Sequence, residues 1–173
     1  MNSQNIPAII AYFFVYLAMQ VLLVANMVLF NRGFFFIYLV FLLLLPFDMK
    51  PIPLMLVGLV TGLTVDLFYD TFGIHAAACV FIMFLRTYWV NTIPPRGGYE
   101  ISMTPTIRVM GFRWFLTYAL PLIFIHNFVL FFIEAGGFHM FGFTITKVVF
   151  SAFLTFIAIV IIQYLFYSAK RGL

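Results

Sequence analysis

The sequence predicts an all-α integral membrane protein, a compact bundle of six transmembrane helices that forms a single domain over residues 1–173. Hydrophobic residues make up 65% of the chain, charged residues make up 8%, and the few charges and turn residues divide the chain into apolar blocks. Because a soluble domain carries about 25% charged residues, nine Lys and Arg with five Asp and Glu cannot coat a globule of this size. This composition excludes a soluble enzyme, a disordered chain and a basic nucleic-acid-binding domain.

The first apolar block, residues 7–30, carries no charge. A helix needs about 20 apolar residues, at about 1.5 Å each, to cross a hydrocarbon core of about 30 Å. The block lacks the basic leader and small-residue cleavage site of a signal peptide, so we expect it to be retained as a span. Ala11, Ala18 and Ala25 recur in it at steps of seven. This small-residue seam either packs internally or receives a partner helix.

The second block, residues 34–47, is short and ends next to Pro46. It is either a short span, helped by Arg32 reaching along its stem to the interface, or a re-entrant segment. We favour the span.

Four further blocks complete the bundle. Pro53 can start the third block, since the first turn of a helix does not need its missing N–H. Pro121 in the fifth block frees a carbonyl of the preceding turn and predicts a local kink. The predicted spans cover about residues 7–30, 34–47, 52–69, 74–91, 112–133 and 143–167.

The basic residues predict the orientation. Six spans place both termini, the turn at 48–51 and the loop at 91–111 on one side of the membrane. Seven of the nine Lys and Arg lie on or nearest that side, and only Arg32 and Lys147 fall to the other. The positive-inside rule therefore predicts cytoplasmic N- and C-termini. A five-span arrangement without the second block would put the basic residues of the loop and of the C-terminus on opposite faces.

The third span carries a regular pattern. Gly58, Gly62, Asp66 and Asp70 stand at steps of four and share one helix face. The two glycines allow another helix to approach closely. The matching small surface is predicted at the three alanines centred on Ala77, because the third and fourth spans form a hairpin.

Asp66 lies about one turn inside the outer end of this span, where an unpaired carboxylate is costly. Its candidate partners are His75 across the hairpin or a group on another protein. Asp70 is interpreted as a turn residue, since an aspartate before Gly73 bonds the local backbone and tolerates left-handed geometry. A metal site of Asp66, Asp70 and His75 lacks a recognised ligand spacing, and we predict no metal or cofactor.

Six polar residues are expected to be buried in the bundle: Asp66, Asp70 and His75 and, further along the chain, Arg86, His126 and Asn127. Arg86 is interpreted as reaching to the cytoplasmic interface, since Asp66 lies too near the opposite leaflet to pair with it. His126 and Asn127, midway through the fifth span, predict hydrogen bonds between helices, with a proton or substrate path as the alternative. No Gly-x-Ser-x-Gly, P-loop, HExxH or GxGxxG motif is present, which predicts that the chain is not an enzyme.

Several segments together resemble a known family. The second block ends Leu-Leu-Leu-Leu-Pro46-Phe47, and the hairpin reads Gly58-Leu-Val-Thr-Gly62-Leu-Thr-Val-Asp66 and then Gly73-Ile-His75-Ala-Ala-Ala. With Pro95-Arg96-Gly97-Gly98-Tyr99-Glu100 and Gly111-Phe-Arg-Trp114-Phe further on, the chain resembles the MreD family of rod shape-determining proteins over nearly its whole length.

The resemblance implies a non-enzymatic inner-membrane component of the bacterial cell-wall elongation machinery, surrounded by membrane lipids. It implies binding to MreC, a single-span protein with a periplasmic domain. It also implies action with the actin-like MreB, RodA and a penicillin-binding transpeptidase.

The MreD family is also similar in fold to the S-components of energy-coupling-factor vitamin transporters, which dock through small residues of the first span. A second class of function therefore stays open, a substrate-binding S-component with a pocket under the outer turn, formed from Asp66 and His75. The short outer loops and the few polar groups favour the scaffold.

Overall fold

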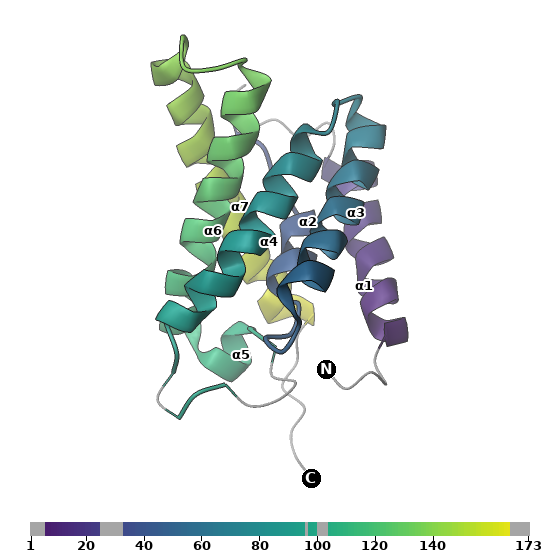
Figure 1. The fold of residues 1–173 in the computed structure, drawn as a ribbon, viewed down its shortest axis with the longest axis vertical. Helices are drawn as coiled ribbons and strands as arrows, with labels where there is room; N and C mark the ends of the chain where they lie inside the picture. Colours follow the sequence, from purple (N-terminus) through teal and green to yellow (C-terminus); the bar gives the residue numbers. More distant parts are fainter. Residues whose placement is uncertain (1–5, 25–32, 96, 100–103, 167–173) are drawn as a thin grey trace.

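The computed structural model describes residues 6–24, 33–95, 97–99 and 104–166. This part of the chain is built from helices and their connections (Figure 1). The elements are α1 (Ile6–Ala18), the π-helix η2 (Met19–Val24), α2 (Tyr38–Leu43), α3 (Pro51–Tyr69), α4 (Ile74–Thr92), α5 (Ile107–Met110), α6 (Phe112–Glu134) and α7 (Phe141–Phe166).

Within the described residues, four helices are long and apolar enough to cross a membrane: α3, α4, α6 and α7. They contain 19, 19, 23 and 26 residues, against the roughly 20 that a bilayer requires. Large apolar side chains such as Leu67 and Phe153 are exposed on their outer faces, as expected of surfaces that contact lipid. The fold is therefore that of an all-α, multi-pass membrane protein.

The first predicted span is only partly described. α1 contains 13 residues and continues directly into the six residues of η2. Residues 25–30 of the predicted span lie outside the described residues. Ala11 and Ala18 of the small-residue seam are both exposed, so these two do not pack internally, and Ala25 lies outside the described residues.

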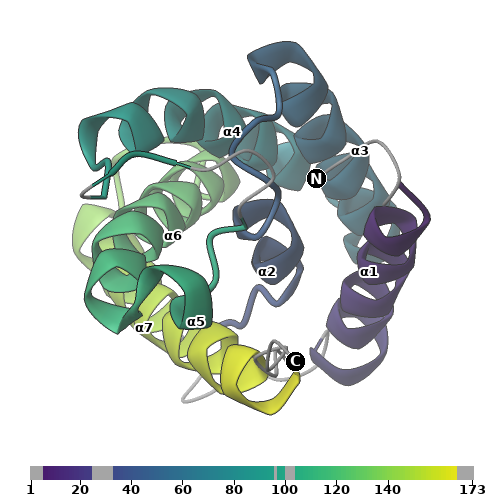
Figure 2. The ribbon, with the colours of Figure 1, turned by 90° about the horizontal axis from the view of Figure 1, so that it is seen from below.

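Five helices surround a sixth. Seen along the bundle, α1, α3, α4, α6 and α7 form a ring, and α2 lies inside it (Figure 2). All six residues of α2 are buried. The core of the protein is therefore built around this short central helix.

The central segment corrects the prediction for the second block. A helix over residues 34–47 was expected, whereas α2 covers only Tyr38–Leu43 and residues 34–36 have no regular secondary structure. Six helical residues rise only about 9 Å, too little to cross a bilayer. Irregular backbone is tolerated at membrane depth only where protein surrounds it, and the helical ring supplies that surrounding.

Polar side chains of the ring hold the irregular segment in place. The backbone N–H of Phe34 donates to Ser151 Oγ at 3.0 Å, and that of Phe36 donates to Thr155 Oγ1 at 3.1 Å. The hydroxyls on α7 thus replace the hydrogen bonds that a helix would have supplied.

The hairpin of α3 and α4 is closely packed at its glycines. A Cβ on Gly62 would lie 2.6 Å from Ala76 N and 2.7 Å from His75 O, so the α3 backbone rests directly on α4. Of the three predicted alanines, Ala76 meets Gly62, whereas the central one, Ala77, is exposed on the outer face. The reason is helical geometry, since adjacent residues point about 100° apart.

Gly58 lies one turn earlier on the same face of α3. A Cβ there would lie 2.9 Å from Met83 Cγ and 3.1 Å from Cys79 O, again on α4. The Gly58 and Gly62 face is therefore used within the hairpin.

Pro121 does free a carbonyl, and another helix uses it. α6 is continuous through Pro121, and proline cannot bond the carbonyl four residues earlier, that of Thr117. The indole Nε1 of Trp89, on α4, donates to this oxygen at 3.2 Å. The proline thus creates a specific contact between α4 and α6.

Gly62→Ala is expected to lower stability by about 1–3 kcal/mol, the usual cost of overpacking, because the new methyl group meets backbone atoms of α4. Gly142→Ala is the matched control, since a Cβ at Gly142 meets nothing within 4 Å and alanine favours the helix. Thermal unfolding in detergent measures both. Equal transition temperatures for the two variants would contradict the close approach at Gly62.

Candidate functional site

Asp66 caps the first turn of the neighbouring helix. It lies near the end of α3, and its side chain is buried at 5% exposure. Its Oδ1 accepts from the backbone N–H of His75 at 3.0 Å, and its Oδ2 accepts from that of Ala76 at 2.9 Å. The N-terminal N–H groups of a helix lack partners within the helix and carry a partial positive charge. The cost of burying this carboxylate is therefore offset by the start of α4.

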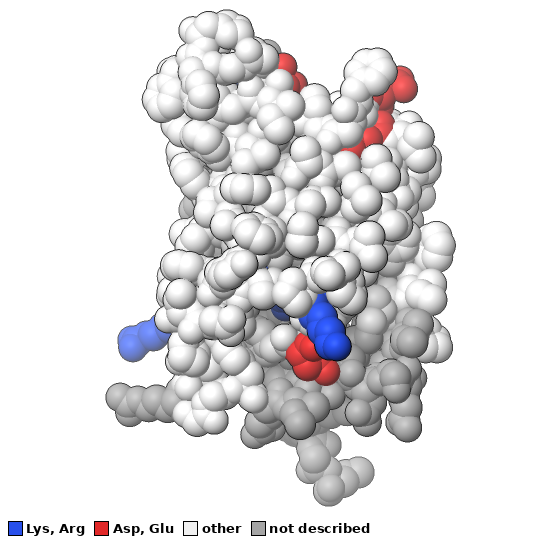
Figure 3. All heavy atoms as spheres, viewed as in Figure 1, with Lys and Arg blue, Asp and Glu red and all other residues white. Residues whose placement is uncertain are grey.

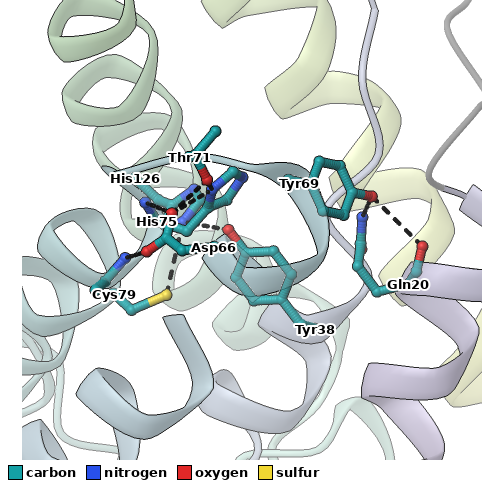
Figure 4. Close-up of polar contacts among 9 residues, drawn as sticks. Gln20, Tyr38, Asp66, Tyr69, Thr71, His75, Cys79 and His126 are labelled. Atoms are coloured by element: carbon teal, nitrogen blue, oxygen red, sulfur yellow. Dashed lines mark hydrogen bonds and ion pairs between the residues drawn. The ribbon is translucent and has the colours of Figure 1, made fainter. Parts of the chain in front are cut away.

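The same carboxylate orients His75, the partner expected across the hairpin (Figure 4). His75 Nδ1 lies 3.1 Å from Asp66 Oδ1 and 3.0 Å from the hydroxyl of Thr71, and that hydroxyl donates to Asp66 Oδ1 at 2.5 Å. Because a carboxylate only accepts hydrogen bonds, Nδ1 carries the proton. The opposite edge of the imidazole ring, with Nε2, is turned away from the carboxylate.

This arrangement differs from a catalytic triad. In a triad, the nucleophile and the orienting carboxylate contact different nitrogens of the histidine, whereas Thr71 and Asp66 both contact Nδ1. The described part of the chain also contains no group of three or more His, Cys, Asp or Glu that could hold a metal ion. The contacts of Asp66 fix the position of the ring and the start of α4.

Asp70 lies outside this cluster, which corrects its prediction as a buried residue. It is exposed, and its φ of 52° is left-handed, as its interpretation as a turn residue required. Its backbone N–H donates to the carbonyl of Asp66 at the end of α3. The step of four places Asp70 beyond the last turn, where the chain has already left the helix.

Arg86 caps the other end of the central segment. It is 2% exposed, and its Nε donates to the hydroxyl of Tyr118 at 2.6 Å while Nη2 donates to the carbonyl of Leu45. The Tyr118 hydroxyl in turn donates to the carbonyl of Leu43 at 2.8 Å. The expectation that Arg86 reaches to the interface is wrong, because the last carbonyls of a buried helix need donors and favour a positive charge.

His126 and Asn127 connect the ring to the central helix. His126 Nδ1 donates to Asn127 Oδ1 at 3.1 Å, and Nε2 lies 2.9 Å from the hydroxyl of Tyr38 on α2. Both residues are fully buried, and Asn127 Nδ2 has no hydrogen-bond partner among the residues that the structure describes. The contact to Tyr38 is the hydrogen bond between helices that the sequence predicts.

The sequence analysis missed Gln20. Its Oε1 accepts from the backbone N–H of Ile37 at 2.6 Å, and its Nε2 donates to the carbonyl of Phe35 and to the hydroxyl of Tyr69. Gln20 is one of only two side-chain amides, with Asn26, in the uncharged apolar block 7–30, and this was the signal that could have found it. It ties the irregular segment to both η2 and α3.

Aromatic side chains close the end of α4. The hydroxyl of Tyr99 donates to the carbonyl of Val90 at 2.8 Å, and the indole of Trp114 donates to that of Ile93 at 2.9 Å. Burial raises the pKa of the Tyr99 phenol, so its hydroxyl stays protonated and able to donate.

The fold and these contacts define a multi-pass helical membrane protein whose buried polar side chains largely bind its own backbone. A scan against protein-family models and searches of curated proteins and of solved structures found no match to this chain.

Asp66→Asn is expected to lower stability by about 1–3 kcal/mol, because charge-assisted hydrogen bonds to the α4 N-terminus are lost. Asp70→Asn is expected to stay within about 0.5 kcal/mol, as is usual for an exposed site, and asparagine tolerates left-handed backbone. Thermal unfolding in detergent compares the two variants. A larger effect at Asp70 would contradict the capping role of Asp66.

Proposed function

We propose that this chain is a non-enzymatic scaffold of the bacterial cell-wall elongation machinery, a member of the MreD family that binds MreC in the inner membrane. The observation that carries the proposal is the use of the buried charges. Asp66 binds the start of α4, and Arg86 binds the end of the central helix. Neither buried charge is directed at a reacting group, which supports a structural role within a larger complex.

The chain path supports six crossings, the second made by the irregular segment together with α2. In Figure 1, α1 begins and α7 ends toward the same end of the bundle, where α4 ends and α6 begins. Lys50, Arg108 and Arg113 belong to elements at that end, and Lys147 follows the start of α7 at the other. On the face in Figure 3, basic and acidic side chains also gather toward opposite ends, with one acidic group beside the basic ones. We assign the basic end to the cytoplasm.

A groove on the outer face of the hairpin is the proposed seat for the membrane span of MreC. Its volume is about 610 Å³, and it lies between α3 and α4. Small residues, Gly73, Ala76 and Ala77, form one part, and Phe81 and Phe84 form another. Membrane helices associate where small residues allow close backbone approach, and this groove combines such residues with aromatic walls.

Reporter fusions at both termini are expected to report a cytoplasmic location, because both lie on the basic side of the six-crossing path. Fusions in the turn at 70–73 and in the 135–140 connection should report the periplasm. A periplasmic C-terminus would contradict the proposed path.

Ala77→Phe is expected to reduce co-purification of MreC at least tenfold, because the ring fills the groove without entering the core. Val149→Phe is the control, since Val149 is 51% exposed on α7 and lies outside the groove. Purification in mild detergent with mass spectrometry measures the bound partners.

Two results would reject parts of this proposal. Equal MreC recovery from both variants would place the partner elsewhere. Recovery of an ATPase module with a vitamin-like compound, in place of MreC and the synthases, would make the chain a transporter subunit.

A further inference from the structure

A separate cavity of about 230 Å³ lies toward the end of the bundle where α3 meets α4 and α6 ends. Its lining comes from the irregular segment, the α3–α4 turn and α6, and includes Phe36, Tyr69, His75 and Glu134. It is distinct from the groove on the outer face of the hairpin, which none of these four residues lines.

His75 supplies this cavity with an unused acceptor. The side chain of His75 is only 5% exposed, and its Nδ1 already contacts Asp66 and Thr71. Nε2 has no hydrogen-bond partner among the described residues. Since the contacts of Nδ1 fix the proton there, Nε2 of the neutral ring presents a lone pair. Because His75 lines the cavity, a ligand there with a donor group can hydrogen-bond to this lone pair.

The walls favour an aromatic ligand. Phe34, Phe36, Tyr69 and Phe131 line the cavity, and the Phe36 and Tyr69 rings lie 6.1 and 5.5 Å from that of His75. Aromatic rings prefer edge-to-face or offset contacts at such separations. The cavity is smaller than the roughly 300 Å³ at which pockets for drug-sized ligands begin, which limits the ligand to one or two rings.

The charges around the cavity favour an uncharged ligand. Glu134 is paired with Lys147 at 3.2 Å. The ammonium of Lys147 also lies 4.6 Å from the ring centre of Phe131 and 5.0 Å from that of Phe34. The carboxylate of Asp66 accepts hydrogen bonds from the backbone N–H groups at the start of α4. The described side chains at the cavity thus leave no charge unpaired for an ionic ligand.

We propose that this cavity binds a small uncharged aromatic molecule whose hydroxyl or N–H group donates to His75 Nε2, between the aromatic walls. The site goes beyond the scaffold function and does not rest on it, because it uses different residues from the partner groove.

The test uses two probes of the same shape, 4-fluorophenol and 4-fluorotoluene, titrated into the full-length protein in mild detergent and followed by fluorine NMR. Only the phenol can donate to Nε2. We expect saturable binding of 4-fluorophenol and at least tenfold weaker binding of 4-fluorotoluene. His75→Phe is expected to abolish this preference.

Two tryptophan variants separate the cavity from the detergent. Ile74→Trp fills the cavity and retains His75, so it is expected to abolish saturable binding. Ile157→Trp is the matched control on the outer face of α7, where Ile157 is 38% exposed, and should bind as the unchanged protein does. Because both tryptophan variants retain His75, they test binding in the cavity even if the His75→Phe variant does not fold.

The proposal is overturned by equal affinity for the two probes, which would indicate an apolar space without selection by His75. It is also overturned by unchanged binding in Ile74→Trp, which would indicate partitioning into the micelle only. Neither outcome affects co-purification of MreC, so the two proposals fail independently.

Discussion

The structure depends on one constraint, that backbone polar groups in an apolar surrounding must find partners within the protein. A continuous helix meets this constraint by itself, but the central segment is helical only at Tyr38–Leu43. Its remaining N–H and carbonyl groups need donors and acceptors from elsewhere. Ser151, Thr155 and Gln20 bind the segment before α2, and Arg86 with Tyr118 binds the carbonyls at its end. The irregular segment therefore determines which polar residues the surrounding helices carry.

The two buried charges follow the same constraint. Asp66 is negative and binds the N–H groups at the start of α4, whereas Arg86 is positive and binds the Leu45 carbonyl just past the end of α2. These are the signs that helix ends favour. A membrane carboxylate or guanidinium is often taken as a sign of transport or catalysis. Here each is explained by the backbone it binds, and the hairpin and the central helix are held by opposite charges.

The sequence predicts the long helices well because their apolar blocks have the length of a bilayer, as in α6 and α7. It also predicts the pairing of Asp66 with His75, since a short hairpin must bring those positions together. It fails at the second block, because the hydropathy of a buried segment does not distinguish a helix from irregular backbone inside a ring of helices. It also fails at Arg86, because the backbone carbonyl that accepts from Arg86 is available only where α2 ends. The register of Ala76 against Gly62 depends on how the helices rotate, which composition does not specify.

The division between interior and exterior also separates the sites of the two proposals. The interior polar groups hold the backbone, so the outer faces are left to lipid, and the side chains that line the hairpin groove are apolar. His75 belongs to both the interior polar groups and the proposed ligand site, because its Nδ1 contacts Asp66 and the residue also lines the cavity proposed for a ligand. Since Asp66 both caps α4 and orients His75, a change at the cap displaces the ring as well. The proposed ligand at His75 and the proposed partner on the hairpin would therefore both contact the pair α3 and α4.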